Sequence, residues 1–168
     1  MKRIHILGRK NHGKTTLIVR LIKKLAELGY KVGAIKHTHH AHQLDVPGKD
    51  SHRFGEAGAA GVGILSRDQS AFFWPRNASD ENAGDDLDQY AQFSEMFASC
   101  DFVLVEGDTQ TDGKKIEVWR AEVGSEPLAK EDASIVAVVS DDAPEVDCPI
   151  WSRSNLDELI KNLLGVLK

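Results

Sequence analysis

The segment Gly8-Arg9-Lys10-Asn11-His12-Gly13-Lys14-Thr15 decides the fold of this 168-residue chain. It matches the phosphate-binding pattern G-x-x-x-x-G-K-[ST], and it stands between an apolar run at 4–7 and a helical pattern at 16–28. This order of strand, loop and helix is the context in which the pattern binds phosphate. The N–H groups of the loop and the positive end of the following helix attract the anion. The sequence therefore predicts a P-loop that holds a nucleoside triphosphate.

Each position of this loop has a predicted role. Lys14 is expected to reach the β- and γ-phosphates, and Thr15 to offer its hydroxyl to Mg²⁺. The other residues expected to line the nucleotide are Gly8, Arg9, Lys10, Asn11, His12, Gly13 and Thr16.

The bulk composition is that of one globular domain spanning residues 1–168. Of the residues, 41% are hydrophobic and 28% charged, and the formal net charge is −5. Nonspecific nucleic-acid binding needs a basic face, so this charge argues against it. No apolar run reaches the length of a membrane span. The two cysteines, Cys100 and Cys148, stand outside any C-x-x-C pattern and read as reduced thiols. We therefore expect a cytoplasmic protein.

Periodicity along the chain predicts alternating strands and helices. Strand patterns occupy 4–7, 31–35, 62–65, 71–74, 102–105, 115–120 and 135–139, and helical patterns occupy 16–28, 50–58, 86–98 and 156–167. Gly29 is expected to end the first helix, Asp50 or Ser51 to cap the second, and Ser154 to cap the last. Several strands are apolar throughout, which is typical of buried parallel strands. We expect an α/β fold, a mostly parallel sheet with helices on both faces.

Two further strand ends are candidate parts of the site, because ligands bind beyond the carboxyl ends of parallel strands. The strand at 102–105 ends at Glu106, whose carboxylate suits the Mg²⁺ shell or the orientation of a water molecule. Lys14 and Glu106 are thus the catalytic candidates. Asp141 follows the strand at 135–139, where a carboxylate can accept hydrogen bonds from guanine, or it is an ordinary residue after a strand.

A histidine-rich segment follows the second strand. His37, His39, His40 and His42 fall within six positions. Three interpretations remain open: a site for Zn²⁺, Ni²⁺ or Cu²⁺; a switch-like loop in which Lys36, His37 and Asp45 touch phosphate and Mg²⁺; and a solvated polar loop.

Several motifs together resemble a known family. They are the P-loop, Lys36-His37-x-x-His40, Asp45-x-Pro47-Gly48-Lys49-Asp50-Ser51, Ala57-Gly58-Ala59 and Leu104-Val105-Glu106-Gly107. In this order they resemble the MobB proteins of molybdopterin-guanine dinucleotide biosynthesis. The resemblance extends over roughly the whole chain and is weakest at 67–100 and after residue 140.

The resemblance implies a P-loop NTPase of the metallochaperone-GTPase type, with GTP and Mg²⁺ as ligands and weak GTP hydrolysis at most. It implies a homodimer that acts as an adapter beside the guanylyltransferase joining GMP to molybdopterin. By position, Thr15, Asp45 and Glu106 are its metal candidates, and Asp50 and Arg53 hold the loop or a second ligand. Many related GTPases carry a lysine directly after the first P-loop glycine, where this chain has Arg9.

Two other functions use the same loop. In a metal-delivering GTPase the histidine cluster would hold Ni²⁺ or Zn²⁺. A small-molecule kinase would transfer the γ-phosphoryl group, but the sequence has no arginine-rich segment suited to a lid, because Arg53, Arg67 and Arg76 are scattered.

Overall fold

The fold is taken from a computed structural model that describes residues 1–38, 44–74 and 89–168. Contacts divide the chain into two compact units. Unit 1 comprises Met1–Thr38 and Tyr90–Lys168, and unit 2 comprises His39–Gln89. The expectation of one domain over 1–168 remains a prediction.

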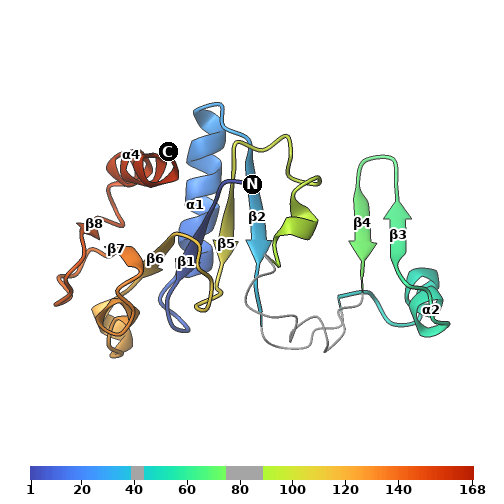
Figure 1. The fold of residues 1–168 in the computed structure, drawn as a ribbon, viewed down its shortest axis with the longest axis horizontal. Coiled ribbons are helices and arrows are strands. Elements are labelled where there is room, and N and C mark those ends of the chain that lie inside the picture. Colours follow the sequence, from blue (N-terminus) through green and yellow to red (C-terminus); the bar gives the residue numbers. More distant parts are fainter. Residues whose placement is uncertain (39–43, 75–88) are drawn as a thin grey trace. The chain divides into compact units, whose positions relative to one another are not determined.

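Unit 1 is built on a parallel sheet of six strands in the order β2-β5-β1-β6-β7-β8 (Figure 1). The strands are β1 (Arg3–Leu7), β2 (Val32–Lys36), β5 (Phe102–Glu106), β6 (Lys115–Val118), β7 (Ile135–Val139) and β8 (Ile150–Trp151). Every neighbouring pair is parallel. The predicted parallel α/β fold is confirmed, and all its strand patterns in this unit correspond to strands. The edge strand β8 was not predicted, because two residues are too short to show a period.

One face of the sheet carries the main core. Helix α1 (Lys14–Glu27) and helix α4 (Leu156–Leu167) both pack there. Buried Leu17, Leu21 and Leu25 of α1 meet Leu159 and Leu163 of α4 over the alternate side chains of the central strands. The spacing that the sequence showed, every third or fourth residue apolar, is what buries one stripe of each helix. Within the described ranges, no helix is long and apolar enough to cross a membrane.

The opposite face is covered over β2 and β5 by the segment that leads into β5. Tyr90, Phe93 and Phe97 pack there against Val103 and Val105. The predicted helix over 86–98 is wrong for its described part, which forms a 3₁₀-helix, η1 (Ala91–Phe93), followed by turns. The spacing of the aromatic residues correctly predicted that they pack in the core. One short 3₁₀ turn, and not a full helix, is enough to place them there. Residues 86–88 lie outside the described residues.

The helix ends follow local backbone chemistry. Gly29 has φ +88°, and Tyr30 N–H donates to Leu25 O, so α1 ends as predicted at a left-handed glycine. The last helix is capped by Asn155, whose side chain accepts from Glu158 N–H, and not by Ser154. The hydroxyl of Ser154 is instead engaged with Asp141.

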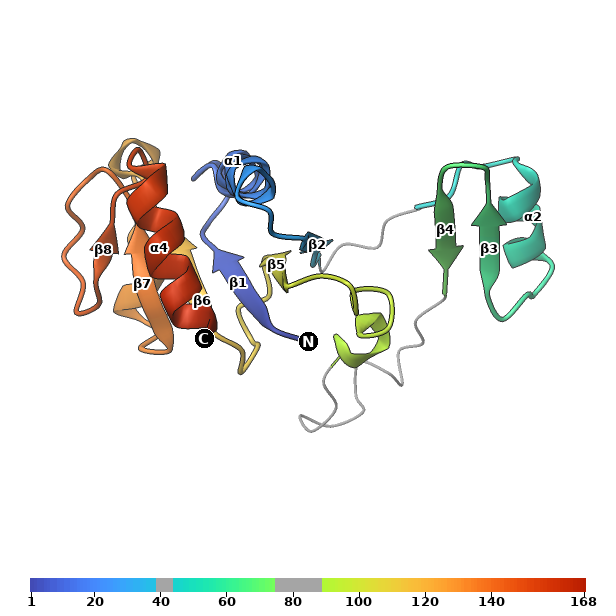
Figure 2. The same ribbon diagram turned by 90° about the horizontal axis from the view of Figure 1, so that it is seen from above.

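Unit 2 consists of a helix and a hairpin. Helix α2 (Asp50–Glu56) lies beside the antiparallel pair β3 (Val62–Leu65) and β4 (Ser70–Phe73) (Figure 2). Its N-cap is Lys49 rather than Asp50 or Ser51, which fall in its first turn.

Buried charges fix the segment that follows β6. Glu117 is fully buried, and its carboxylate accepts hydrogen bonds from Leu128 N–H and Ala129 N–H at 2.8 and 2.9 Å. Burial raises the pKa of Glu117, and these two bonds oppose that rise. These bonds hold the chain between β6 and β7 against strand β6.

The packing of α4 can be tested at Leu163, which is completely buried. We expect Leu163→Ala to lower the free energy of unfolding by about 2–5 kcal/mol, because it removes buried methyl groups and leaves a cavity. Lys161→Ala, on the exposed side of the same helix, should change it by less than about 0.5 kcal/mol. Urea denaturation followed by circular dichroism measures both, and equal stability of the two variants would contradict this packing.

Candidate functional site

The P-loop lies directly against the neighbouring strand. Gly8 has φ +137°, and a Cβ there would stand 2.4 Å from the carbonyl oxygen of Val118 at the end of β6. Gly13, with φ +86°, is the N-cap of α1. Asn11 adopts φ 70°, the left-handed region that asparagine tolerates better than most residues. The glycines of the pattern are therefore required by the backbone itself.

Lys14, Thr15 and Glu106 come together at one end of the loop. The Thr15 hydroxyl lies 3.0 and 2.9 Å from the two carboxylate oxygens of Glu106. Lys14 Nζ donates to Arg9 O at 2.9 Å. Partial burial lowers the pKa of Lys14, and Lys36 lowers it further while Glu106 raises it. A phosphate oxygen beside Lys14 would favour the charged form of its amine.

These residues line a cavity of about 420 Å³. Its walls are Lys10, Asn11, Gly13, Lys14, Thr15, Thr16, Glu106 and Arg120. Leu17 N–H makes an intrahelical hydrogen bond, to Gly13 O, so the N–H groups of residues 14–16 precede the hydrogen-bond ladder of α1. The cavity combines positive side chains, a helix N-terminus and one carboxylate, a set suited to a phosphate chain.

His12 ties the loop to the segment after β6. It is fully buried; its Nδ1 accepts from Arg120 N–H at 2.9 Å, and its Nε2 lies 2.8 Å from the Ser125 hydroxyl. Its ring stacks on Trp119 with centroids 6.5 Å apart. An acceptor at Nδ1 requires the neutral ring. Burial lowers the pKa of His12, and the charges of Lys14, Arg120 and Arg9 lower it further. His12 is thus a buried support of the loop, and its place in the nucleotide lining remains a prediction.

Sequence reasoning missed two arginines at this site. Arg120 follows β6 and lines the cavity, and its guanidinium pairs with Glu122. Arg153 follows β8, and its Nη2 would lie 2.8 Å from a Cβ at Gly13. Neither stands in a recognisable motif. Their position just after a strand could have indicated them, because the carboxyl ends of parallel strands meet at one edge of the sheet.

The backbone after Glu106 turns sharply beside the site. Gly107 has φ +92° and Asp108 has φ +68°. Asp108 is buried and accepts a hydrogen bond from the Tyr90 hydroxyl at 2.8 Å, with His5 Nδ1 at 4.0 Å. His37 N–H donates to Glu106 O at 2.9 Å. The turn that carries Glu106 is therefore held by Tyr90 and His37, the residues at or next to the ends of unit 1 that lead to unit 2.

Other predicted site residues have different surroundings. Asp141 Oδ1 accepts from Ser154 N–H and from the hydroxyls of Ser152 and Ser154, and these bonds lower its pKa. Asp45 belongs to unit 2, where its carboxylate accepts from Val46 N–H and Ser51 Oγ. Their nucleotide and metal roles remain predictions.

The histidine cluster is mostly outside the described residues: His39, His40 and His42 lie there, and only His37 does not. In the part of the chain that is described, no group of three or more His, Cys, Asp or Glu side chains is arranged to hold a metal ion.

Comparison with known proteins identifies the family. The family MobB, described as "Molybdopterin guanine dinucleotide synthesis protein B", matches residues 3–141. The chain belongs to this family. This confirms the resemblance seen in the sequence motifs, of which the P-loop, the 36–51 segment and Glu106-Gly107 all lie within the matched range.

Relatives and solved structures agree with this assignment. The molybdopterin-guanine dinucleotide biosynthesis adapter protein of Escherichia coli K12 is 35% identical over 149 residues, which cover 88% of this chain and 82% of the relative. The protein of the same name from Haemophilus influenzae is 37% identical over 154 residues, covering 92% and 83%. A crystal structure of molybdopterin-guanine biosynthesis protein B superposes with TM-score 0.71 at 26% identity, covering 98% of each chain.

The buried His12 predicts a pH dependence of stability. The pKa of His12 in the folded chain lies below its usual 6.5. As the pH falls below about 6.5, the unfolded chain therefore binds a proton at this residue before the folded chain does. Its contribution to stability is therefore complete above about pH 6.5 and declines as pH falls toward the folded pKa. We expect the free energy of unfolding to fall less steeply between about pH 7 and 5 in His12→Gln, which cannot titrate, than in the natural chain.

Chemical denaturation at a series of pH values measures this difference. The pKa of His5 is also lowered, mainly by its burial, but His5 is present in both proteins, so the comparison isolates His12. Parallel pH profiles for the two proteins would contradict the neutral, accepting state of His12.

Proposed function

We propose that this chain is a GTP-binding adapter in the biosynthesis of molybdopterin guanine dinucleotide, with weak GTP hydrolysis at most. The observation that carries the nucleotide part is the meeting of Lys14, Thr15 and Glu106 at the mouth of a P-loop cavity. The pathway comes from family membership and from relatives named as adapter proteins. The family assignment favours this function over a metal-delivering GTPase or a small-molecule kinase.

The residues at this site fit a bound Mg²⁺ ion. Thr15 and Glu106 offer oxygen atoms within 3.0 Å of each other, and oxygen is the donor that Mg²⁺ prefers. When bound, the ion would neutralise charge on the β- and γ-phosphates. In this proposal the Thr15 hydroxyl and the Glu106 carboxylate would hold the ion, and Lys14 would turn from Arg9 O to a phosphate oxygen.

GTP binding is tested at Lys14. Lys14→Ala removes a charge-assisted hydrogen bond to phosphate, so we expect GTP affinity to fall by about ten- to a hundredfold. Isothermal calorimetry with GTP and ATP measures the affinity, and EDTA tests its dependence on Mg²⁺. Lys161→Ala removes the same charge from an exposed site and should leave the affinity unchanged. Undiminished GTP binding by Lys14→Ala would place the phosphate site elsewhere.

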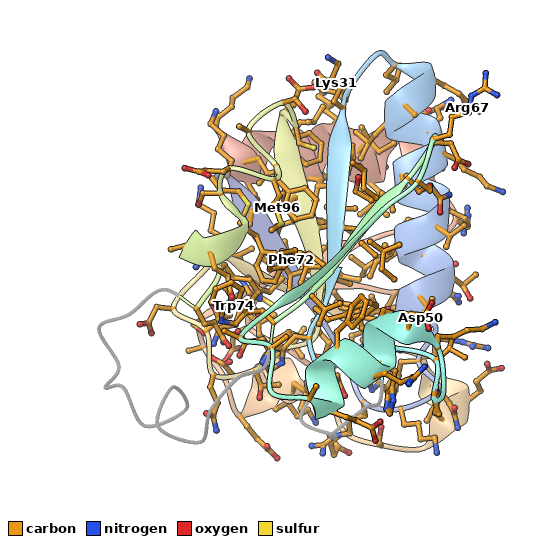
Figure 3. The ribbon with its side chains drawn as sticks, turned by 90° about the vertical axis from the view of Figure 1, so that its right-hand side faces the viewer. Lys31, Asp50, Arg67, Phe72, Trp74 and Met96 are labelled. Carbon is orange, nitrogen blue, oxygen red and sulfur yellow. The ribbon has the colours of Figure 1, made fainter. Side chains whose placement is uncertain are left out.

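The proposed partners are the molybdopterin guanylyltransferase and a second copy of the chain, in the cytoplasm. The surface that supports self-association lies in unit 2. Large apolar side chains are exposed there, namely Leu44, Val46, Phe54, Ile64, Leu65, Phe72 and Trp74. Phe72 of β4 and the following Trp74 are labelled in Figure 3, and their rings stack with centroids 5.6 Å apart. A two-stranded hairpin is barely stable alone, so a covering surface would stabilise it.

Dimerisation through this surface is tested by charge. The double substitution Phe72→Glu and Trp74→Glu places two carboxylates in the apolar surface, and we expect it to convert a dimer into a monomer by light scattering after gel filtration. Arg67→Glu, at the turn of the same hairpin, is the control and should stay dimeric. If the natural chain is monomeric at all concentrations, the proposed homodimer is contradicted. The guanylyltransferase would then be the remaining proposed partner for this surface.

A further inference from the structure

The structure places two arginine side chains together beside the P-loop. Arg153 Nη2 and Arg120 Nη1 would lie 2.8 and 3.9 Å from a Cβ at Gly13. Their backbones come from different strand ends, β8 and β6. A third arginine, Arg20 of α1, donates to Arg153 O at 3.4 Å. Two guanidinium groups thus lie at the N-terminal end of α1, which is itself partially positive, and Arg20 contacts the backbone of one of them.

The guanidinium of Arg153 has positively charged neighbours. Burial, together with the charges of Arg120 and Arg20, lowers the pKa of Arg153, and Asp141 opposes this only in part. Arg153 Nε is buried and makes no hydrogen bond among the residues that the structure describes. Glu122 pairs with Arg120 from its exposed side. Like charges held this close are usually retained where an anion binds between them.

The order of the strands indicates which part of a bound nucleotide would contact Arg120 and Arg153. Glu106 ends β5 on one side of β1, whereas Arg120 follows β6 on the other side. Thr15 contacts Glu106, so the Mg²⁺ ion and the β- and γ-phosphates of the proposed function belong at the β5 side. A phosphate chain that continues across the first N–H groups of α1 reaches the β6 side next.

We propose that Arg120 and Arg153 bind the α-phosphate of the nucleotide, and that His12 holds the backbone of Arg120 in place for this contact. Arg120 lines the same cavity as Lys14 and Thr15, and its N–H donates to His12 at the centre of the P-loop. Arg153 approaches from the Gly13 side, where its Nη2 lies 2.8 Å from the position a Cβ would take. The inference rests on the proposed nucleotide binding and extends it to residues outside the P-loop motif.

The test compares GTP, GDP and GMP, which all carry an α-phosphate; GMP has no β-phosphate, so a loss that GMP shares assigns the contact to the α-phosphate, and a loss that spares GMP would overturn that assignment. Calorimetry on the natural chain, Arg120→Ala and Arg153→Ala should show that each substitution weakens GTP and GDP alike, by about tenfold or more, because each removes a charge-assisted hydrogen bond. The ratio of GTP to ATP affinity should stay unchanged. Arg153→Lys keeps the charge but not the planar fork, so it should restore part of the loss. Lys161→Ala, the matched charge control, should bind both nucleotides normally.

A stability measurement separates ligand binding from a structural role. Without nucleotide, Arg153→Ala should melt at the same temperature as the natural chain or higher, because it relieves repulsion; a structural arginine would lower the melting temperature. Unchanged GTP and GDP affinities in both variants would overturn the proposal. A loss confined to GTP would place the arginines at the γ-phosphate, and an altered GTP to ATP ratio would place them at the base; either would overturn it as well.

The two proposals fail in different ways. If the natural chain binds neither GTP nor GDP, the proposed function fails. If it binds both and the arginine variants bind equally well, only the assignment of Arg120 and Arg153 fails.

Discussion

The close approach of the P-loop to strand β6 is the constraint on which the rest of the site depends. Residue 8 has no space for a side chain, because a Cβ there would stand 2.4 Å from the carbonyl oxygen of Val118. The loop therefore leaves β1 pressed against β6, between that strand and β5. This places a carboxylate, Glu106, on one side of the loop and a cation, Arg120, on the other. The polarity of the cavity follows from the order of the strands as much as from the motif itself.

The same packing explains why a histidine is tolerated inside a phosphate-binding loop. A charged imidazole at residue 12 would add to the repulsion from Lys14, Arg9 and Arg120. Burial beneath Trp119 and a hydrogen bond from Arg120 N–H keep the ring neutral. His12 thus supports the loop and the segment after β6 as one piece, without adding positive charge to the cavity.

Much of the fold could be read from the sequence, because continuous apolar runs such as 102–105 and 135–139 have one common solution, a buried parallel strand. The apolar stripes of helices α1 and α4 predicted these two helices equally well. The segment 89–100 was not predicted correctly, since aromatic spacing fits a helix or a packed turn equally well. Arg120 and Arg153 could not be found either: they are 33 residues apart in sequence, and only the strand order brings them to Gly13.

The turn that carries Glu106 connects the P-loop cavity to the rest of the chain. Glu106 O accepts from His37 N–H, and Asp108, two residues on, accepts from Tyr90. His37 lies just before unit 2 in the sequence, and Tyr90 directly follows it. Any ligand that moved the Glu106 carboxylate would act on a backbone already strained at Asp108. The residues that hold this turn are therefore the same ones at which the chain of unit 1 leads into unit 2 and returns from it.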